Sequence, residues 1–268
     1  AVRRALGIRR VGHAGTLDPP ATGLLVVMVG RATRLARFVS LMPKRYAGTI
    51  TLGSETTTDD ATGEVVGERD DSWRARLPPE SDAARRNVQA QTEQRPPAVS
   101  AKKVDGVRAY RLARRGETPA LKPATVTIER LRCERFDRTT GEIHVDVVCS
   151  SGTYVRSIAR DVGRELGSKA HLSALRRTEI GGWKVEQAVE LEGLEPSALS
   201  LRLLPMREAV NHLPAVILPA DEAKRFSLGQ RIPAAAPTGP VAVFDVTDLL
   251  GVAELADGVL HPEVVLVG

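Results

Sequence analysis

The chain has 268 residues with 38 Lys or Arg and 33 Asp or Glu, which gives a formal charge of +5 and an isoelectric point near 9.5. This length suits one large domain, or a large domain followed by a small one, and an apolar share of 42% can fill a core. Only four Phe, three Tyr and two Trp occur, which argues against a sheet that stacks many RNA bases on aromatic rings.

Cysteine spacing and hydropathy narrow the class further. Cys133 and Cys149 have neither the spacing of metal ligands nor a disulfide framework, which indicates a reducing compartment. The longest nearly apolar run, residues 24–29, is too short to span a bilayer, and no signal-peptide core opens the chain. We therefore expect a cytoplasmic protein without membrane contact and without a metal. No stripe of residues suitable for a dimer interface is seen in the sequence, so a monomer is expected.

The patterns of the first 150 residues predict strands and helices in an irregular order. In chain order they predict a strand over 24–29, a helix over 33–38, a strand over 46–52, an exposed loop over 53–64, helices over 81–88 and 107–115, and strands over 125–136 and 142–150. Pro96 and Pro97 would end the helix over 81–88, and Gly116 would follow the helix over 107–115.

An amphipathic helix is predicted between Ser151-Gly152 and Gly167. Its apolar side chains recur at helical spacing: Val155, Ile158, Ala159, Val162 and Leu166. Arg156, Arg160 and Arg164 follow one another at four-residue steps on another face. The pattern therefore predicts an apolar stripe on the core and a basic stripe beside it.

The composition changes at about residue 212. The last segment is acidic and rich in Pro, Gly and Val. It predicts short strands over 215–218, 241–246, 251–256 and 264–267, with a loop over 233–240. We expect a body of residues 1–211 and a small β-rich domain of residues 212–268. Because the body lacks regular βαβ alternation, the expected class is α+β.

Positive charge is concentrated in three segments. Residues 1–45 hold nine Lys or Arg and one acid, a net of +8; residues 101–115 hold six and one, a net of +5; residues 151–177 hold six and two, a net of +4. Residues 46–79 and 212–268 each hold three cations and seven acids, a net of −4. If the fold gathers the three basic segments, they form a face for a polyanion such as nucleic acid. The alternative is that each is a solvated helix face.

The most specialised segment is residues 12–23, GHAGTLDPPATG. Three glycines and two prolines within twelve residues predict a tightly turned loop whose backbone can approach a ligand closely. It lacks the patterns of nucleotide-phosphate loops. Asp18 is the only carboxylate side chain of the first 45 residues. Ordinary Asp-Pro turn chemistry would account for Asp18 alone, but it leaves the surrounding loop unexplained.

The motifs of this chain resemble those of the TruB family of tRNA pseudouridine synthases. Residues 12–19, GHAGTLDP, are similar to the family's GHxGTLDP signature. Four further stretches agree in the same order: KRY at 44–46 with LG at 52–53 and TTDDATG at 57–63, QRPPAVSAKKVDG at 94–106 with AY at 109–110, CSSGTYVRSIA at 149–159, and LRR at 175–177. Five ordered motifs over nearly the whole chain are far more specific than any one of them.

The resemblance implies an isomerase that converts uridine to pseudouridine at position 55 in the T-arm of tRNA, with no cofactor and no metal. It also implies the pseudouridine synthase fold, a mixed and mainly antiparallel sheet with flanking helices, followed by a PUA-like domain. The target base must leave the folded RNA, which costs a few kcal/mol. Whether the essential aspartate attacks the base, attacks the sugar or removes a ribose proton stays open.

The resemblance assigns a role to each active-site residue. Asp18 matches the catalytic aspartate, and Arg156 the arginine that pairs with it. Tyr46 matches the tyrosine that packs on the uracil and whose hydroxyl could assist a proton transfer. Tyr154 and Leu175 match residues that line the pocket. Without the resemblance, Arg156 would be expected to be a solvated cation. Packing roles would be expected for Tyr46, Tyr154 and Leu175.

RNA contacts are expected from four further residues: His13, Lys103, Arg176 and Arg177. His13 matches a loop histidine that enters the space left by flipped nucleotides, and Lys103 matches a lysine that touches the RNA backbone. Three features depart from the family. The C-terminal segment that resembles its PUA domain is net negative, so its RNA contact is expected to be local and modest. Val99 stands where a tyrosine is usual. The family's N-terminal strand, with its DKPxGxTS motif, would precede Ala1, and a chain without it is expected to be destabilised at one sheet edge.

Two other functions remain compatible with these residues. One is a tRNA-binding and folding helper in which catalysis is lost or secondary, and the other is a synthase that acts on a different RNA uridine. An intact set of Asp18, Tyr46 and Arg156 favours the enzyme, because a binder has no need of a buried acid–arginine pair.

Overall fold

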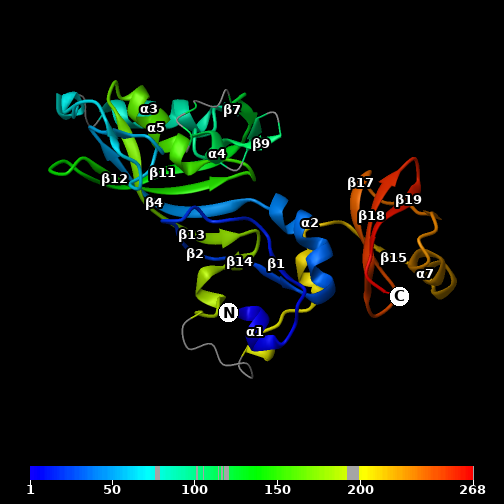
Figure 1. The fold of residues 1–268 in the computed structure, drawn as a ribbon. Helices are drawn as coiled ribbons and strands as arrows, with labels where there is room; N and C mark the ends of the chain where they lie inside the picture. Colours follow the sequence, from blue (N-terminus) through cyan, green and yellow to red (C-terminus); the bar gives the residue numbers. More distant parts are fainter. Residues whose placement is uncertain are drawn as a thin grey trace. The chain divides into compact units, whose positions relative to one another are not determined.

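The computed structural model describes residues 1–75, 79–100, 102–104, 106–113, 115, 117, 121–191 and 199–267 (Figure 1). The chain divides into two compact units. The larger unit comprises Leu17–Leu24 and Met42–Gln187, and the smaller unit comprises Ala1–Thr16, Leu25–Leu41 and Ala188–Gly268. Among the described residues, no helix is both long and apolar enough to cross a membrane.

The larger unit is built on a six-stranded sheet in the order β11-β12-β4-β13-β14, with β2 beside β13. These strands are β2 (Thr22–Gly23), β4 (Lys44–Leu52), β11 (Ile128–Asp137), β12 (Glu142–Cys149), β13 (Ala170–Ile180) and β14 (Trp183–Lys184). All neighbours are antiparallel except β2 and β13. The predicted α+β class with a mixed, mainly antiparallel sheet is therefore confirmed.

Helices cover one face of this sheet, where α3 (Pro79–Gln89) packs on α5 (Val155–Glu165) (Figure 1). Alternation along β4 places Ile50 and Leu52 on the covered face and leaves Thr49 and Thr51 on the other. The five apolar residues predicted on α5 are all buried in this core. A Cβ on Gly163 of α5 would lie 2.6 Å from Cβ of Ala170, so only glycine allows this close approach of helix to sheet.

Small elements complete the larger unit. They are the two-stranded pairs β5 (Glu55–Thr56) with β6 (Val65–Val66), β7 (Glu93–Gln94) with β10 (Ala124–Thr125) and β8 (Lys103–Val104) with β9 (Val107–Arg108), the helix α4 (Ala109–Ala113), and the 3₁₀ turns η2 (Ser72–Ala75) and η3 (Val185–Gln187). Residues 57–63 form the turn between β5 and β6, and their placement matters for the site below.

The smaller unit contains a five-stranded sheet in the order β15-β17-β18-β19-β16. Its strands are β15 (Ala215–Ile217), β16 (Ile232–Pro233), β17 (Gly239–Phe244), β18 (Leu249–Ala256) and β19 (Val259–Val265). Phe226 of α7 (Ala220–Ser227) is fully buried in its core with Leu255 and Leu260. The unit also contains α1 (Val2–Leu6), β1 (Val11–His13), β3 (Val27–Val29), η1 (Gly30–Leu35), α2 (Ala36–Leu41) and η4 (Met206–Ala209). The predicted β-rich C-terminal segment is thus confirmed.

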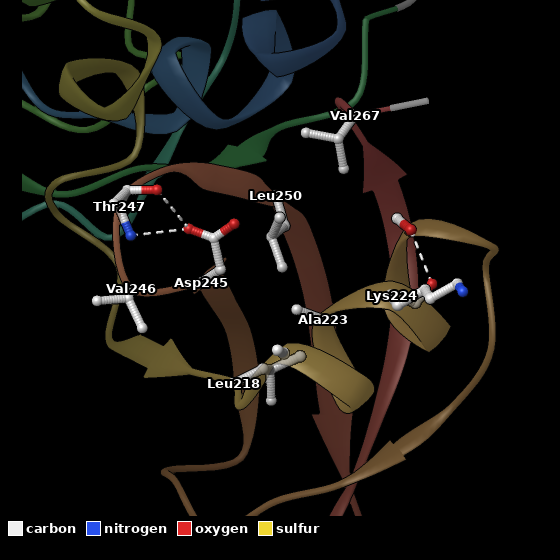
Figure 2. A pocket seen from close by; sticks show the side chains of 10 residues that line it. Leu218, Ala223, Lys224, Asp245, Val246, Thr247, Leu250 and Val267 are labelled. Carbon is white, nitrogen blue, oxygen red and sulfur yellow. Dashed lines mark hydrogen bonds between the residues drawn. The ribbon is translucent and has the colours of Figure 1, made fainter.

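One face of α7 lines a groove of about 560 Å³ in the smaller unit (Figure 2). Its floor is apolar, with Leu218, Ala223 and Leu250. Asp245 at its edge is occupied by its own turn, because its Oδ1 accepts hydrogen bonds from the backbone N–H groups of Thr247 at 2.8 Å and Asp248 at 2.7 Å. These two bonds hold the pKa of Asp245 below its usual value.

Several predicted elements differ from the structure. The predicted exposed loop 53–64 contains β5 and the buried residues Asp59 and Asp60, the predicted helix 33–38 is divided between η1 and α2, and the predicted strand 125–136 is divided between β10 and β11. In the predicted strand 24–29, only residues 27–29 are extended as β3, because Leu24 belongs to the larger unit and bonds the backbone of Arg177 while the next residue belongs to the smaller unit. The predicted helix 107–115 begins two residues late, because Val107 and Arg108 pair with β8 in a hairpin that turns at Gly106 (φ 82°). Residues 114 and 116 of that prediction lie outside the described residues.

Candidate active site

The aspartate of the glycine-rich loop is fixed to the central sheet by the residues that follow it. The backbone N–H of Ala21 donates to the carbonyl of Asp18 at 2.9 Å, which closes a turn over the two prolines. Thr22 and Gly23 then pair with Arg176 and Arg177 as β2. Gly23 has φ 98°, and a Cβ there would lie 2.2 Å from the carbonyl O of Arg177. Only glycine fits this position, so the sequence of the loop determines where Asp18 lies.

Asp18 forms a two-point ion pair with Arg156. Nε of Arg156 donates to Oδ2 at 2.8 Å, and Nη2 donates to Oδ1 at 2.9 Å. The Arg156 side chain is 5% exposed, whereas that of Asp18 is 32% exposed. The pair therefore has a buried cation and an acid with one open side, where a substrate can reach the carboxylate. Such a planar fork fixes both the distance and the orientation of the carboxylate.

Arg156 is held in turn by two segments from elsewhere in the chain. Its Nη1 donates to the carbonyl of Thr58 at 3.0 Å and to that of Val99 at 3.1 Å. Oδ2 of the buried Asp60 lies 3.5 Å from the same nitrogen. A single guanidinium thus joins the Asp18 loop, the β5–β6 turn and the segment after β7.

Tyr46 and Tyr154 interact with this pair, and Leu175 packs against the same core cluster as Tyr46. Tyr46 and Leu175 lie on neighbouring strands. Burial raises the pKa of Tyr46, a hydrogen bond from Arg177 opposes that rise, and the charge of Asp18 adds to it. Burial likewise raises the pKa of Tyr154, whose ring centroid lies 5.9 Å from Cζ of Arg156. The structure therefore places Tyr46 and Tyr154 near the pair of Asp18 and Arg156, whereas Leu175 is placed only in the core cluster that Tyr46 also contacts.

The structure adds a residue that the sequence analysis did not single out. Asp60 is buried, and its Oδ1 accepts hydrogen bonds from Oγ1 of Thr58 at 2.7 Å, from the N–H of Thr62 at 2.9 Å and from Oγ1 of Thr62 at 2.5 Å. Although burial alone would raise its pKa, these bonds and Arg156 lower it below the usual value. The signal was present in TTDDATG, where threonines surround an acid in a turn that ends at a glycine.

The four predicted RNA contacts have different surroundings. His13 is exposed on β1 of the smaller unit, and Arg176 is exposed on β13, on the sheet face opposite Leu175. The backbone of Lys103 lies in β8, and its side chain is outside the described residues. Arg177 is 1% exposed and donates from Nε to the carbonyl of Leu24 at 2.7 Å. The expected RNA contact of Arg177 is therefore corrected: its guanidinium braces the Asp18 loop and Tyr46, out of reach of a phosphate.

Several Arg and Lys side chains of the basic segment 1–45 form hydrogen bonds or ion pairs within the protein. Three arginines of η1 and α2 donate to the last strand and its end: Arg31 to the carbonyl of Leu266, Arg34 to that of Val265, and Arg37 to the carboxylate of Glu263. Lys44 is buried, and its Nζ donates to the carbonyl of Met42 at 2.7 Å. Only a part of the predicted cationic face is thus open to a polyanion. Within the described residues, no group of three His, Cys, Asp or Glu could hold a metal ion.

Comparison with known families and proteins gives a consistent result. Residues 3–155 match the N-terminal domain of the TruB family of pseudouridylate synthases, residues 156–224 match a tRNA pseudouridylate synthase B C-terminal domain, and residues 214–266 match the C-terminal domain of pseudouridine synthase II TruB. The chain is 46% identical to tRNA pseudouridine synthase B of Thermobifida fusca, covering 100% of this chain and 92% of that protein. It is 46% identical to that of Leifsonia xyli, covering 89% and 80%.

Similar folds occur among solved structures. The chain superposes on one from a Cbf5-Nop10-Gar1 complex with a TM-score of 0.73 at 22% identity, covering 99% of this chain and 79% of that one. A second, from an H/ACA RNP bound to a substrate RNA containing 2′-deoxyuridine, gives a TM-score of 0.68 at 20% identity, covering 100% and 79%. At this level of identity, the likeness concerns the fold.

Proposed function

The chain belongs to the TruB family of pseudouridylate synthases and isomerises uridine to pseudouridine in tRNA, and we propose that its target is the uridine at position 55 in the T-arm, with Asp18 as the essential carboxylate. The observation that carries the proposal is the two-point pair of Asp18 with Arg156. It supports a carboxylate that is paired with a buried cation and held in a fixed orientation, with one side open to a base.

The reaction asks little more of the protein than this group and a place to hold the base. The N1–C1′ bond of the uridine breaks, the uracil turns, a C5–C1′ bond forms, and the proton lost from C5 is balanced by one gained at N1. No electrons are exchanged with another molecule. Each of the three routes considered for the aspartate begins from an ionised carboxylate, which Arg156 stabilises in place.

We propose that the target uridine leaves the RNA stack and packs on the ring of Tyr46. One flipped base needs one platform, which agrees with the low aromatic content. His13, Lys103 and Arg176 remain proposed RNA contacts, with phosphate binding also from the exposed arginines of residues 3–10. The protein is proposed to work as a monomer in the cytoplasm, with residues 1–211 as the catalytic domain and 212–268 as a PUA-like RNA-binding domain.

The experiment that tests the target is site mapping with the full-length protein. A tRNA transcript and a free T-arm stem-loop would be incubated with enzyme, and pseudouridine would be mapped chemically. A matched stem-loop with cytidine in place of the target uridine serves as the control. We expect one modified position in both RNAs and none in the control. Modification at another uridine would refute the target, and binding without any product would favour the folding helper.

A further inference from the structure

A second buried arginine lies one turn after Arg156 on α5. The side chain of Arg160 is 9% exposed, and its Nη1 donates to Oδ2 of Asp59 at 2.9 Å. Its Nη2 donates to the carbonyl of Arg95 at 2.9 Å, and its Nε donates to Oδ1 of Asp161 at 3.1 Å. Arg160 therefore uses its whole fork to join α5 to the β5–β6 turn and to the segment after β7.

These are the two segments that hold Arg156. Thr58, whose carbonyl accepts from Arg156, is the residue before Asp59, and Val99, which supplies the other carbonyl, lies four residues after Arg95. A shift of either segment would therefore move an acceptor of Arg156 and, through it, the carboxylate of Asp18.

The segment after β7 is docked on α5 by further bonds. Oγ of Ser157 donates to the carbonyl of Arg95 at 2.9 Å, beside the bond from Arg160. The amide of Gln94 bonds both backbone groups of Tyr154: the Tyr154 N–H donates to Oε1 at 2.8 Å, and Nε2 donates to the Tyr154 carbonyl at 3.2 Å. Arg160 is the member of this set that also reaches the other segment.

The backbone of Asp59 adds an independent observation. Asp59 has φ 58°, a left-handed conformation that is uncommon outside glycine and that Asp and Asn adopt more often than other residues. Such a conformation persists where the surroundings determine it, and it is enriched at functional sites. Here the Asp59 side chain is held by Arg160, while its carbonyl accepts from the N–H of Leu172 on β13 at 3.0 Å. The unusual turn therefore sits between the sheet and the helix that carries Arg156.

We propose that Arg160 and Asp59 form a positioning pair, which fixes the orientation of Arg156 against Asp18 through the two segments that they share. This inference rests on the proposed role of Asp18. Arg160 does not contact Asp18, so its effect is on the geometry of the reacting groups and not on RNA binding.

The test uses the full-length protein, a T-arm stem-loop, and the variants Arg160→Met, Asp59→Asn and the double variant. Single-turnover rates at saturating enzyme, RNA affinity and thermal midpoints are measured for each. Arg86→Gln, an exposed arginine on α3, is the matched control. We expect each single variant to lose about 10- to 100-fold in rate, because a displacement of about 1 Å at reacting groups has effects of this size. RNA affinity should stay within about threefold, and the double variant should lose about as much as the worse single variant.

Rates within twofold of wild type for folded Arg160→Met and Asp59→Asn would overturn the positioning pair, as would rate losses matched by equal losses in affinity. A fully additive double variant would also overturn it. If Arg160→Met does not fold, Asp59→Asn decides by the same rate criterion, because it keeps the size of the side chain. Asp18→Asn, measured in parallel, separates the two proposals: wild-type activity in Asp18→Asn refutes the proposed function, whatever the Arg160 variants show.

Discussion

Replacing Arg156 tests how much of the activity depends on the held carboxylate. The Arg156→Ala variant removes both bonds to Asp18 and the bonds to the carbonyls of Thr58 and Val99. A hydrogen bond to a charged group contributes about 1.5–3 kcal/mol. Because Asp18 is 32% exposed, water replaces part of what is lost, and we take about 3 kcal/mol for the effect on the reaction. That energy corresponds to a rate about 100-fold lower.

The effect on RNA binding should be much smaller. At 5% exposure, the Arg156 guanidinium is not open to a phosphate, so RNA affinity should change less than about threefold. The assay is single-turnover formation of pseudouridine in a T-arm stem-loop, with affinity measured on the same RNA. Arg156→Lys keeps the charge but lacks the planar fork, so its rate should lie between the rates of wild type and Arg156→Ala. Equal losses of rate and affinity in Arg156→Ala would refute the reasoning and make Arg156 a phosphate contact.

Three further predictions concern the loop, a buried lysine and the RNA-binding surface. Gly23→Ala should lower the free energy of unfolding by more than about 1 kcal/mol, and the rate with it, because φ is 98° and the new Cβ would meet the Arg177 carbonyl; an unchanged urea midpoint would contradict this. Burial, followed by the charge of Arg177, lowers the pKa of Lys44 from 10.5 to about 8, so the folded state releases this proton first and stability should rise between pH 8 and 10.5. Lys44→Met should remove that rise and stabilise the protein at pH 7 by up to about 3 kcal/mol. If wild type and Lys44→Met have the same urea midpoint as each other both at pH 7 and at pH 9.5, the prediction is contradicted. The affinity for the T-arm should fall as salt rises, by about 0.7 to 0.9 logarithmic units per tenfold salt for each phosphate contact, and a flat dependence would argue against phosphate binding.

The sequence predicted the fold well where a pattern is local. The apolar stripe of α5 and the alternation of β4 depend on residues within one element, and both appear as expected. The predicted basic stripe of α5 fared differently. Arg164 is 64% exposed, whereas Arg156 and Arg160 are buried at 5% and 9%. Periodicity could not distinguish them, because the acids and carbonyls that receive the buried pair lie in segments far away in the chain.

The family motifs predicted the active-site residues, but they did not predict the residues that hold Arg156 and the Asp18 loop in place. Residue types and order identified Asp18 and Arg156, which the structure joins directly. The bracing roles of Asp60, Arg160 and Arg177 depend on which loop meets which strand. Arg177 of β13, for example, lies on the same face of the sheet as Tyr46 of the neighbouring strand β4, whereas Arg176 points to the other face. A run of two arginines gives no sign of this difference until the strand is placed.

The central claim is that Asp18 is the carboxylate on which the reaction depends, and Asp18→Asn tests it most directly. The change keeps the shape of the side chain and removes its charge, and the measurement is pseudouridine formed in a T-arm stem-loop under single-turnover conditions at saturating enzyme. We expect RNA binding within a few fold of wild type and no detectable product. Product formed at the wild-type rate would contradict the claim.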